Sequence, residues 1–352
     1  MADQTKSLAA ETLRAYTAEL FAKGGMSEED AGCFADELIQ TSLWGIDSHG
    51  VLRVPVYFER ILHRGINPAP KMTYEQIAPA LTLIDADEAA GCIAAGKAME
   101  RAVENARKTG IGAAGVRNSN HYGAAALYAK IAADAGMIGI ALTNVPALVT
   151  APGAKRGVVG NNPISIGVPT FCEFPFLLDT SLSAIAEGKL RLALAKGESI
   201  PLGVAVDQEG RDTDDPARAL EGFLLPIGGI KGLGLAYAVD ILSGVITGGA
   251  FADMVHSSYN CPDVPSRTCH LMIAIDQSPF IRKEDMQKRM RQYHDYIRGV
   301  PLVDGASPLC FPGEIEHQIE QERRKTGIPV PLITLEQMRK LGVQYGVKTV
   351  LS

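Results

Sequence analysis

The segment ARKTGIGAAGV, residues 106–116, decides between two interpretations of the fold. Its glycines match G-x-G-x-x-G, a fingerprint that binds a dinucleotide when it follows a strand and opens a helix. Here the glycines follow an expected helix over 91–108 and lead into an expected strand over 111–116. Gly110 is therefore interpreted as the residue that ends the helix. This context argues against a Rossmann fold in spite of the matching letters.

Patterning on either side of this segment predicts a mixed fold. Apolar spacing typical of helices fills most of the first 70 residues, and it returns over 283–298, 314–326 and 334–341. Between these regions, expected strands alternate with expected helices, which favours an α/β or α+β arrangement. The strands are expected over 80–85, 111–116, 137–143, 165–168, 176–178 and 271–275, and the helices over 91–108, 122–135, 182–195 and 232–242.

Composition narrows the class of protein. The 352 residues suggest two or three domains, and the formal net charge of -6 gives no reason to expect a nucleic acid or an anionic membrane as partner. No apolar run reaches the length of a membrane span, and residues 1–9 lack the apolar core of a signal peptide. The six cysteines form no C-x-x-C pair and the histidines no H-x-x-x-H. We therefore expect reduced thiols, no metal site and a cytoplasmic location.

A second segment, Asp47-Ser48-His49-Gly50 with Arg53, gathers groups that suit catalysis on an oxo acid. Arg53 can hold a carboxylate through two parallel hydrogen bonds, and His49 can transfer a proton near neutral pH. The two residues are four apart, so they share a face if the segment is helical. The alternative interpretation is structural: Asp47 or Ser48 caps a helix, and His49 is a surface residue behind it.

Three further segments place polar residues or glycines at expected helix starts. Residues 117–123 follow a strand, and their His121 lies near a helix N-terminus that would favour a neutral imidazole. Residues 179–183 precede a helix that carries Lys189, and they can bind ribose and phosphate. The segment 228–234, GGIKGLG, offers N–H groups and a lysine to an anion. Each segment also has a purely structural interpretation, as a turn, a helix cap or a tight loop.

Taken together, these segments resemble the malate/L-lactate dehydrogenase family, which is unrelated to the Rossmann dehydrogenases. That family also includes ureidoglycolate, sulfolactate and diketogulonate oxidoreductases and a cyclic-imine reductase. The matching residues follow the family's order along nearly the whole chain. They are 47–51 with Arg53, 117–123, Asn162-Pro163-Ile164, Asp179 with Gly188-Lys189, 228–235 and Pro312-Gly313-Glu314.

The resemblance implies a fold of the α+β or α/β class. Helices would surround a largely antiparallel sheet that binds a nicotinamide cofactor. A mainly helical domain would be formed by both chain ends, here 1–70 completed by about 283–352. Residues 71–282 would form the cofactor- and substrate-binding domain. The expected assembly is a homodimer.

The same resemblance implies roles for individual residues. His49 and His121 would transfer protons, Ser48 would orient or relay, and Arg53 would hold the substrate carboxylate. The expected cofactor contacts are Asn144, Asp179, Thr180, Ser181, Lys189, Lys231, Gly313 and Glu314. The cofactor is NAD or NADP, a choice that the sequence leaves open, and the substrate is a small-molecule carboxylate.

The expected reaction interconverts a small 2-hydroxy acid and its 2-oxo acid by hydride transfer, with a histidine moving the proton. The alternative is reduction of a cyclic imine carboxylate or a diketo sugar acid. Two other classes are a non-catalytic ligand-binding protein and a serine hydrolase built on Ser48 or Ser183. The hydrolase is disfavoured because no G-x-S-x-G elbow is present, and because adjacent Ser48 and His49 are not expected to face each other.

Overall fold

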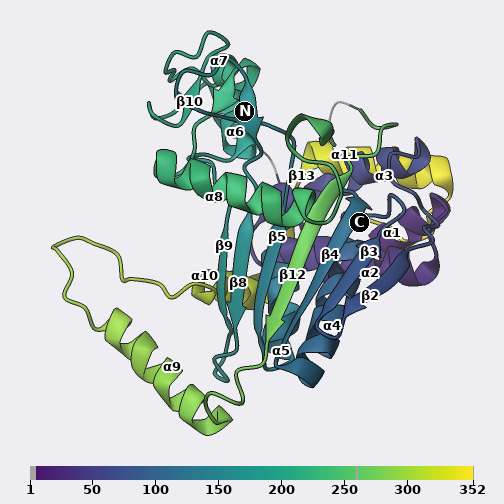
Figure 1. Cartoon of the computed structure of the whole chain (residues 1–352). Helices are drawn as coiled ribbons and strands as arrows, with labels where there is room; N and C mark the ends of the chain where they lie inside the picture. Colours follow the sequence, from purple (N-terminus) through teal and green to yellow (C-terminus); the bar gives the residue numbers. More distant parts are fainter. Residues whose placement is uncertain (1–4, 259–260, 352) are drawn as a thin grey trace.

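A seven-stranded sheet forms the core of the computed structural model, which describes residues 5–258 and 261–351 (Figure 1). The strand order is β2-β3-β4-β12-β5-β8-β9; the pair β3–β4 is parallel, and the other neighbouring pairs are antiparallel. This arrangement confirms the largely antiparallel sheet that the resemblance implies. The strands are β2 (Thr73–Ala78), β3 (Leu81–Asp85), β4 (Ile111–Ser119), β5 (Ile138–Thr143), β8 (Ile164–Val168), β9 (Phe176–Thr180) and β12 (Thr268–Ile275).

The segment 106–116 shows why the Rossmann interpretation fails. Helix α4 (Gly91–Thr109) ends at Gly110, whose φ of 82° is left-handed, and β4 begins at the next residue. At Gly112, within β4, a Cβ would come within 2.1 Å of the carbonyl oxygen of Ala102 in α4. The first glycine therefore ends a helix, and the second permits close packing of helix on sheet.

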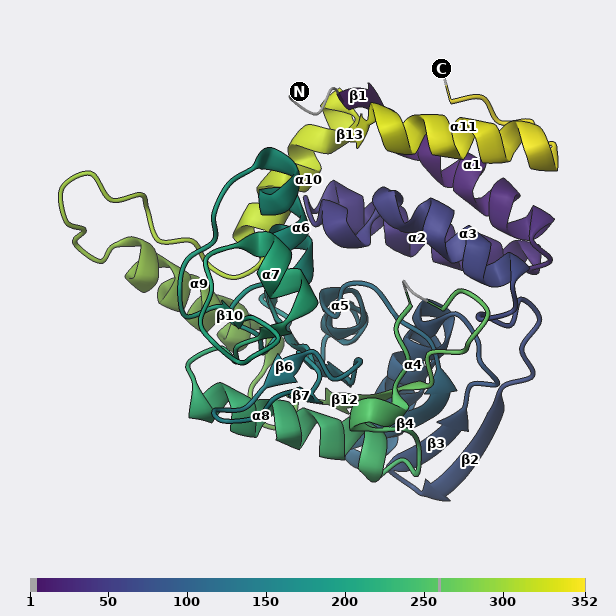
Figure 2. The same ribbon diagram turned by 90° about the horizontal axis from the view of Figure 1, so that it is seen from above.

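Helices cover both faces of this sheet (Figure 2). Helices α4 and α5 (Ala126–Asp134) pack on one face, and α8 (Ile230–Asp240) lies on the other. The side chains of β12 alternate accordingly: Met272 and Ala274 enter the core under α4 and α5, whereas Leu271 enters the core under α8. Because both faces are apolar, the register of the sheet is strongly specified.

Both chain ends join in one helical region, as the resemblance implies. Strand β1 (Thr5–Leu8) pairs antiparallel with β13 (Ile328–Pro331). Helix α2 contacts α4, so this region rests on the helical layer of the sheet (Figure 2). Its helices are α1 (Ala10–Lys23), α2 (Glu28–Leu43), α3 (Val54–Leu62), α10 (Glu314–Thr326) and α11 (Leu332–Tyr345).

The chain also forms a smaller four-stranded sheet, of order β10-β11-β6-β7, and two further helices. They are β6 (Val149–Thr150), β7 (Gly157–Val159), β10 (Ala205–Val206), β11 (Phe223–Leu224), α6 (Glu187–Lys196) and α7 (Pro216–Glu221). Helix α9 (Lys283–Arg298) projects away from the sheet (Figure 1). The predicted domain boundaries near 70 and 283 stay predictions, and residues 1–4, 259–260 and 352 of those domains lie outside the described residues.

Candidate active site

Two histidines from distant parts of the sequence meet where the helical region contacts the rest of the fold. His49 lies in the link between α2 and α3, and His121 follows β4. Their rings are stacked, with centroids 5.6 Å apart and planes inclined by 27°. Two segments that the sequence singled out separately therefore form one site.

The link that carries His49 consists of two short 3₁₀ turns, residues 47–49 and 51–53. Arg323 of α10 anchors it: the guanidinium donates to both oxygens of the Asp47 carboxylate, at 2.5 and 2.9 Å. Because α10 belongs to the other end of the chain, the position of His49 depends on the joining of the two ends. Asp47 is thus an ion-pair anchor, and no side-chain hydrogen bond caps either turn.

A hydroxyl and a guanidinium accompany His49 in this link. The hydroxyl of Ser48 lies 2.9 Å from Nδ1 of His49. The expectation that these adjacent residues would not face each other was therefore wrong, because the side chains bend toward each other across the turn. The Nε of Arg53 donates to the backbone carbonyl of Ser48 at 2.7 Å. The two turns of this link thus bring together three of the four predicted catalytic side chains.

Both imidazoles are held neutral. Burial lowers the pKa of His49 to about 4, and the nearby charge of Arg53 adds to this effect. Burial also lowers the pKa of His121 well below its usual value, with Arg53 and His49 acting in the same direction. The neutral His121 expected from a helix N-terminus is confirmed, but its main cause is burial. At pH 7 neither ring is an imidazolium.

A further side chain, Tyr57 of α3, completes this cluster. Its hydroxyl oxygen lies 2.6 Å from Nδ1 of His121, and the backbone N–H of Gly123 donates to the same nitrogen at 3.3 Å. An N–H group only donates, so Nδ1 is an acceptor, and the proton of the neutral ring sits on Nε2. Tyr57 therefore donates to Nδ1. Sequence reasoning missed Tyr57, although its position four residues after Arg53 was an available signal.

Asp179 lies at the end of β9 and faces the start of α5. Its Oδ2 accepts from the backbone N–H of Ala126 at 3.0 Å, an interaction that the positive end of a helix favours. The residue is exposed at the surface, yet protein atoms crowd the carboxyl group, and this burial raises its pKa to about 6. The hydroxyl of Thr180 donates to the backbone carbonyl of Ser181 at 3.0 Å. Asp179 therefore titrates closer to neutral pH than an ordinary carboxyl group.

Helix α6 reaches the histidine cluster through its first turn. A Cβ on Gly188 would lie 3.6 Å from the Cβ of Ser48. The helix start that carries Lys189 is therefore beside the turn that carries His49. The side chain of Lys189 is exposed, and its contact with a cofactor stays a prediction.

The loop before α8 has the features of an anion site. Gly228 and Gly229 have φ of 59° and 65°. Chain neighbours apart, no heavy atom of the described residues comes within 4 Å of a Cβ position on either glycine. Lys231 is exposed in the first turn of α8. Open backbone at a helix start, next to a lysine, fits the phosphates of a nucleotide cofactor.

Three other predicted cofactor residues are tied into the fold. Asn144 is fully buried; its amide donates to Asp240 at the end of α8 at 3.0 Å and accepts from the backbone N–H of Cys269 at 2.8 Å. Gly313 has φ of 95° at the start of α10, and the carboxylate of Glu314 accepts a backbone hydrogen bond within the same turn. Asn144 thus holds α8 to β12. The cofactor contacts of all three residues stay predictions.

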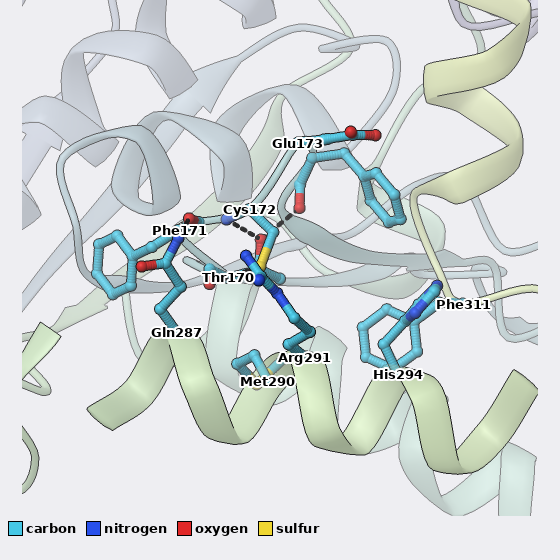
Figure 3. Close-up of a pocket in the computed structure, with 10 residues that line it drawn as sticks. Thr170, Phe171, Cys172, Glu173, Gln287, Met290, Arg291, His294 and Phe311 are labelled. Atoms are coloured by element: carbon cyan, nitrogen blue, oxygen red, sulfur yellow. Dashed lines mark hydrogen bonds between the residues drawn. The ribbon is translucent and has the colours of Figure 1, made fainter. Parts of the chain in front are cut away.

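A separate cavity of about 480 Å³ lies between residues 170–174 and α9 (Figure 3). Arg291 and His294 extend from α9 toward it, and Phe311 closes one side. The described residues that line it include none of the predicted catalytic side chains. The groups with proton-transfer chemistry gather instead at the histidine cluster.

Comparison with known proteins shows the family. The malate/L-lactate dehydrogenase family matches residues 8–339. The chain belongs to this family. A malate dehydrogenase of Pyrococcus abyssi is 38% identical to it over 344 residues, which cover 96% of this chain and 94% of that protein. The resemblance seen in the motifs is therefore confirmed over nearly the whole chain.

Solved structures of this family share the fold. Sulfolactate dehydrogenase from Methanocaldococcus jannaschii superposes with a TM-score of 0.91 at 34% identity, over 98% of both chains. A delta1-piperideine-2-carboxylate reductase from Pseudomonas syringae pvar. tomato superposes with a TM-score of 0.87 at 26% identity, over 96% of this chain and all of that one (100%). The chain is thus an oxidoreductase, and its family implies a nicotinamide cofactor.

Two other features bear on the class of protein. Within the described residues, no helix combines the length and apolar character that crossing a membrane requires. The same part of the chain contains no group of three or more histidine, cysteine, aspartate or glutamate side chains placed to hold a metal ion.

Proposed function

We propose that this member of the malate/L-lactate dehydrogenase family interconverts a small 2-hydroxy acid and its 2-oxo acid, with NAD or NADP as cofactor. The observation that carries the proposal is the stacked, neutral His49–His121 pair with Arg53 beside it. This reaction needs a cation for the carboxylate and a proton donor for the carbonyl oxygen. Relatives named malate and sulfolactate dehydrogenase support this substrate class.

Each residue of the cluster has a distinct proposed role. When bound, the nicotinamide supplies or accepts the hydride. Arg53 holds the substrate carboxylate through its planar guanidinium. The Nε2–H of His121 donates to the carbonyl oxygen and transfers its proton as that oxygen gains charge. His49, stacked on His121, is the second proposed proton-transfer residue, and Ser48 orients it through the contact at Nδ1.

We infer that the cofactor phosphates bind at the loop 228–231, where Lys231 adds charge to open backbone N–H groups. The start of α6 lies beside Ser48, so the helix that carries Lys189 borders the same space. The other residues that we propose to contact or shape the cofactor site are Asn144, Asp179, Thr180, Ser181, Gly313 and Glu314.

The proposal is tested by oxidation of NADH and NADPH with a panel of 2-oxo acids, using the parent protein and an Arg53→Lys variant. Lysine keeps the charge but loses the planar fork, and a hydrogen bond to a charged group contributes about 1.5–3 kcal/mol. We expect kcat/KM toward 2-oxo acids to fall roughly 10–100-fold. Cofactor affinity should not change.

Aldehydes or ketones without a carboxylate serve as the matched control for that variant. They should be poor substrates of the parent, and Arg53→Lys should affect them little. Equal losses on all substrates would mean that the substitution disturbs the fold, and that the carboxylate is held elsewhere. No oxidation of either cofactor with any oxo acid would contradict the proposed function.

A second candidate is the reduction of a cyclic imine carboxylate, because a piperideine-2-carboxylate reductase shares the fold. The same arginine and proton donor would serve an imine carboxylate, whose nitrogen takes the place of the carbonyl oxygen. A diketo sugar acid is the other alternative substrate. Both belong in the substrate panel, and kcat/KM values rank them against simple 2-oxo acids.

We propose a second copy of the chain as partner, and a cytoplasmic location. Support for the homodimer comes from α8 and the segment after it, where Leu235, Ile241 and Ile246 are 57%, 51% and 61% exposed. Large apolar side chains exposed along one segment are typical of an interface. Sedimentation velocity should give a dimer, and Ile246→Glu should shift it toward monomer.

A further inference from the structure

If His121 is neutral when it gives up its proton, its ring must receive another proton from a second donor. When Nε2 passes its proton to a carbonyl oxygen, the ring becomes anionic unless Nδ1 gains a proton in the same step. Nδ1 already accepts from the hydroxyl of Tyr57 at 2.6 Å. The hydroxyl of Tyr57 is therefore the donor in place, and it must be resupplied in turn.

A small cavity adjoins Tyr57. It gives the centre of a water molecule about 10 Å³, which is room for one water. Such a water needs two to four polar partners. The polar side chains that line the cavity include Glu37, Thr41, His49, Tyr57 and Cys92. The site is therefore polar, and its volume meets the lower limit of about 10–15 Å³ for a single bridging water.

Glu37 is the acid of this cavity. Its Oε2 lies 3.0 Å from the hydroxyl oxygen of Tyr128, whose single proton goes to the backbone carbonyl of Tyr122, and the thiol of Cys92 hydrogen-bonds to the same carboxyl group. Burial raises the pKa of Glu37 to about 8, which these hydrogen bonds only partly oppose. At pH 7 the side chain therefore holds a proton that it can release.

We propose that Glu37 is the source of the proton used in catalysis. Glu37 protonates Tyr57 through one water in this cavity, and Tyr57 protonates Nδ1 of His121. The inference rests on the proposed reduction of an oxo acid at this site. Glu37 does not touch the substrate. It acts through Tyr57 and is a relay residue.

The proposed step balances in atoms and charge. The carbonyl carbon gains a hydride from the nicotinamide, which is oxidised, and the oxygen gains the proton from Nε2 of His121. Nδ1 takes the Tyr57 proton, the Tyr57 oxygen takes one from the water, and the water takes the proton of Glu37. After product release, solvent reprotonates Nε2, and the transfers run backward to restore Glu37. No separate path from Glu37 to solvent is needed.

Protonation of Glu37 makes the reduction pH-dependent. The rate should fall as pH rises through about 8, where the folded protein releases this proton. On α2, the negative charge of Asp36 raises the pKa of Glu37 further. The ionisable groups that face Glu37 from α4, α5, its own helix and the cavity wall are Cys92, Tyr128, Cys33, Asp36, His49, Tyr57 and Tyr122.

The first test is Glu37→Gln, which keeps a polar side chain beside the hydroxyl of Tyr128 but has no acidic proton. We expect kcat for 2-oxo acid reduction to fall at least tenfold at pH 7, within the 10²–10⁴-fold range of acid catalysis. KM and cofactor affinity should be unchanged, and the fall in rate near pH 8 should disappear. Asp36→Asn is the matched control, because its exposed carboxylate pairs with Arg14 at 2.5 Å. It should keep the parent rate at pH 7 and an alkaline fall, which should begin at a slightly lower pH because the charge that raises the pKa of Glu37 is removed.

The second test asks whether Glu37 and Tyr57 act as one unit. Members of a relay are non-additive, so Glu37→Gln combined with Tyr57→Phe should be no slower than the slower single variant. Losses that multiply in the double variant would show independent roles and would overturn the relay.

Two failures are distinguishable. If the parent protein reduces no oxo acid, the proposed function and the relay are both contradicted. If the parent is active and the Glu37→Gln variant has the same rate and the same fall in rate near pH 8, the relay alone is contradicted. NMR of the ring nitrogens in cofactor-free protein gives a readout that needs neither activity nor a folded Glu37 variant. It should place the His121 proton on Nε2, and a proton on Nδ1 would overturn the relay.

Discussion

The histidine cluster and the glycine loop before α8 use polar groups in opposite ways. His49 and His121 are packed against each other and beside Arg53, so that burial sets their protonation state. Gly228, Gly229 and Lys231 lie open to solvent. The first region works because the protein removes water, and the second because the protein leaves room for a ligand. Substitutions should therefore change rate and pH dependence in the first region and cofactor affinity in the second.

The largest effect is expected at the histidine cluster. His121→Ala removes the group that donates to the carbonyl oxygen, so turnover should fall about 10²–10⁴-fold. Direct titration of the cofactor should give a nearly unchanged Kd. His63→Ala, at the exposed end of α3, is the control and should behave as the parent. A His121→Ala variant with parental turnover would mean that the cluster is structural.

A smaller effect of the opposite kind is expected in the glycine loop. Lys231→Ala should weaken cofactor binding roughly tenfold, since a hydrogen bond to a charged group contributes about 1.5 kcal/mol, with little change in kcat at saturating cofactor. Lys108→Ala, at the exposed end of α4, controls for the loss of one positive charge. Unchanged affinity in a direct titration would assign the loop a purely structural role, and the contrast between the two regions would disappear.

A contrast between local and long-range causes explains which elements the sequence could predict. Helices over 283–298 and 314–326 match their predicted bounds, because long apolar periods carry a strong signal. The decoy glycines near 110 were interpreted correctly from their neighbours along the chain. Two-residue strands such as 205–206 and 223–224 were missed, because two residues show no period. Local patterns thus identified elements whose cause is local.

The site was predicted in parts. Its motifs appear in the sequence because each is contiguous, as in Asp47 to Arg53. The contacts that give those motifs their chemistry join segments far apart: Asp47 with Arg323, Tyr57 with His121, and Glu37 with the cavity beside Tyr57. No local pattern encodes such pairs. The glycine loop needed less of this tertiary information, because its backbone is shaped by its own residues.

The smallest effect is expected at Asp179, which combines features of the two regions. Although exposed, its carboxyl group has a pKa raised to about 6 from an ordinary 3.8, so the folded protein binds this proton more tightly than the unfolded chain does. Its contribution to folding stability therefore declines as pH rises from about 4 to about 6, and stays low above that range.

Asp179→Asn removes this decline while an amide oxygen still accepts from Ala126. The melting temperature of the variant minus that of the parent should therefore increase between pH 4 and pH 7. Asp134→Asn, an exposed carboxylate of α5 paired with Lys130, should show no such increase. A difference for Asp179→Asn that does not vary with pH would mean that its carboxylate is as well hydrated in the folded protein as in the unfolded chain. Asp179 would then belong with the open loop, where ligands act on an exposed backbone, and not with the cluster whose chemistry depends on burial.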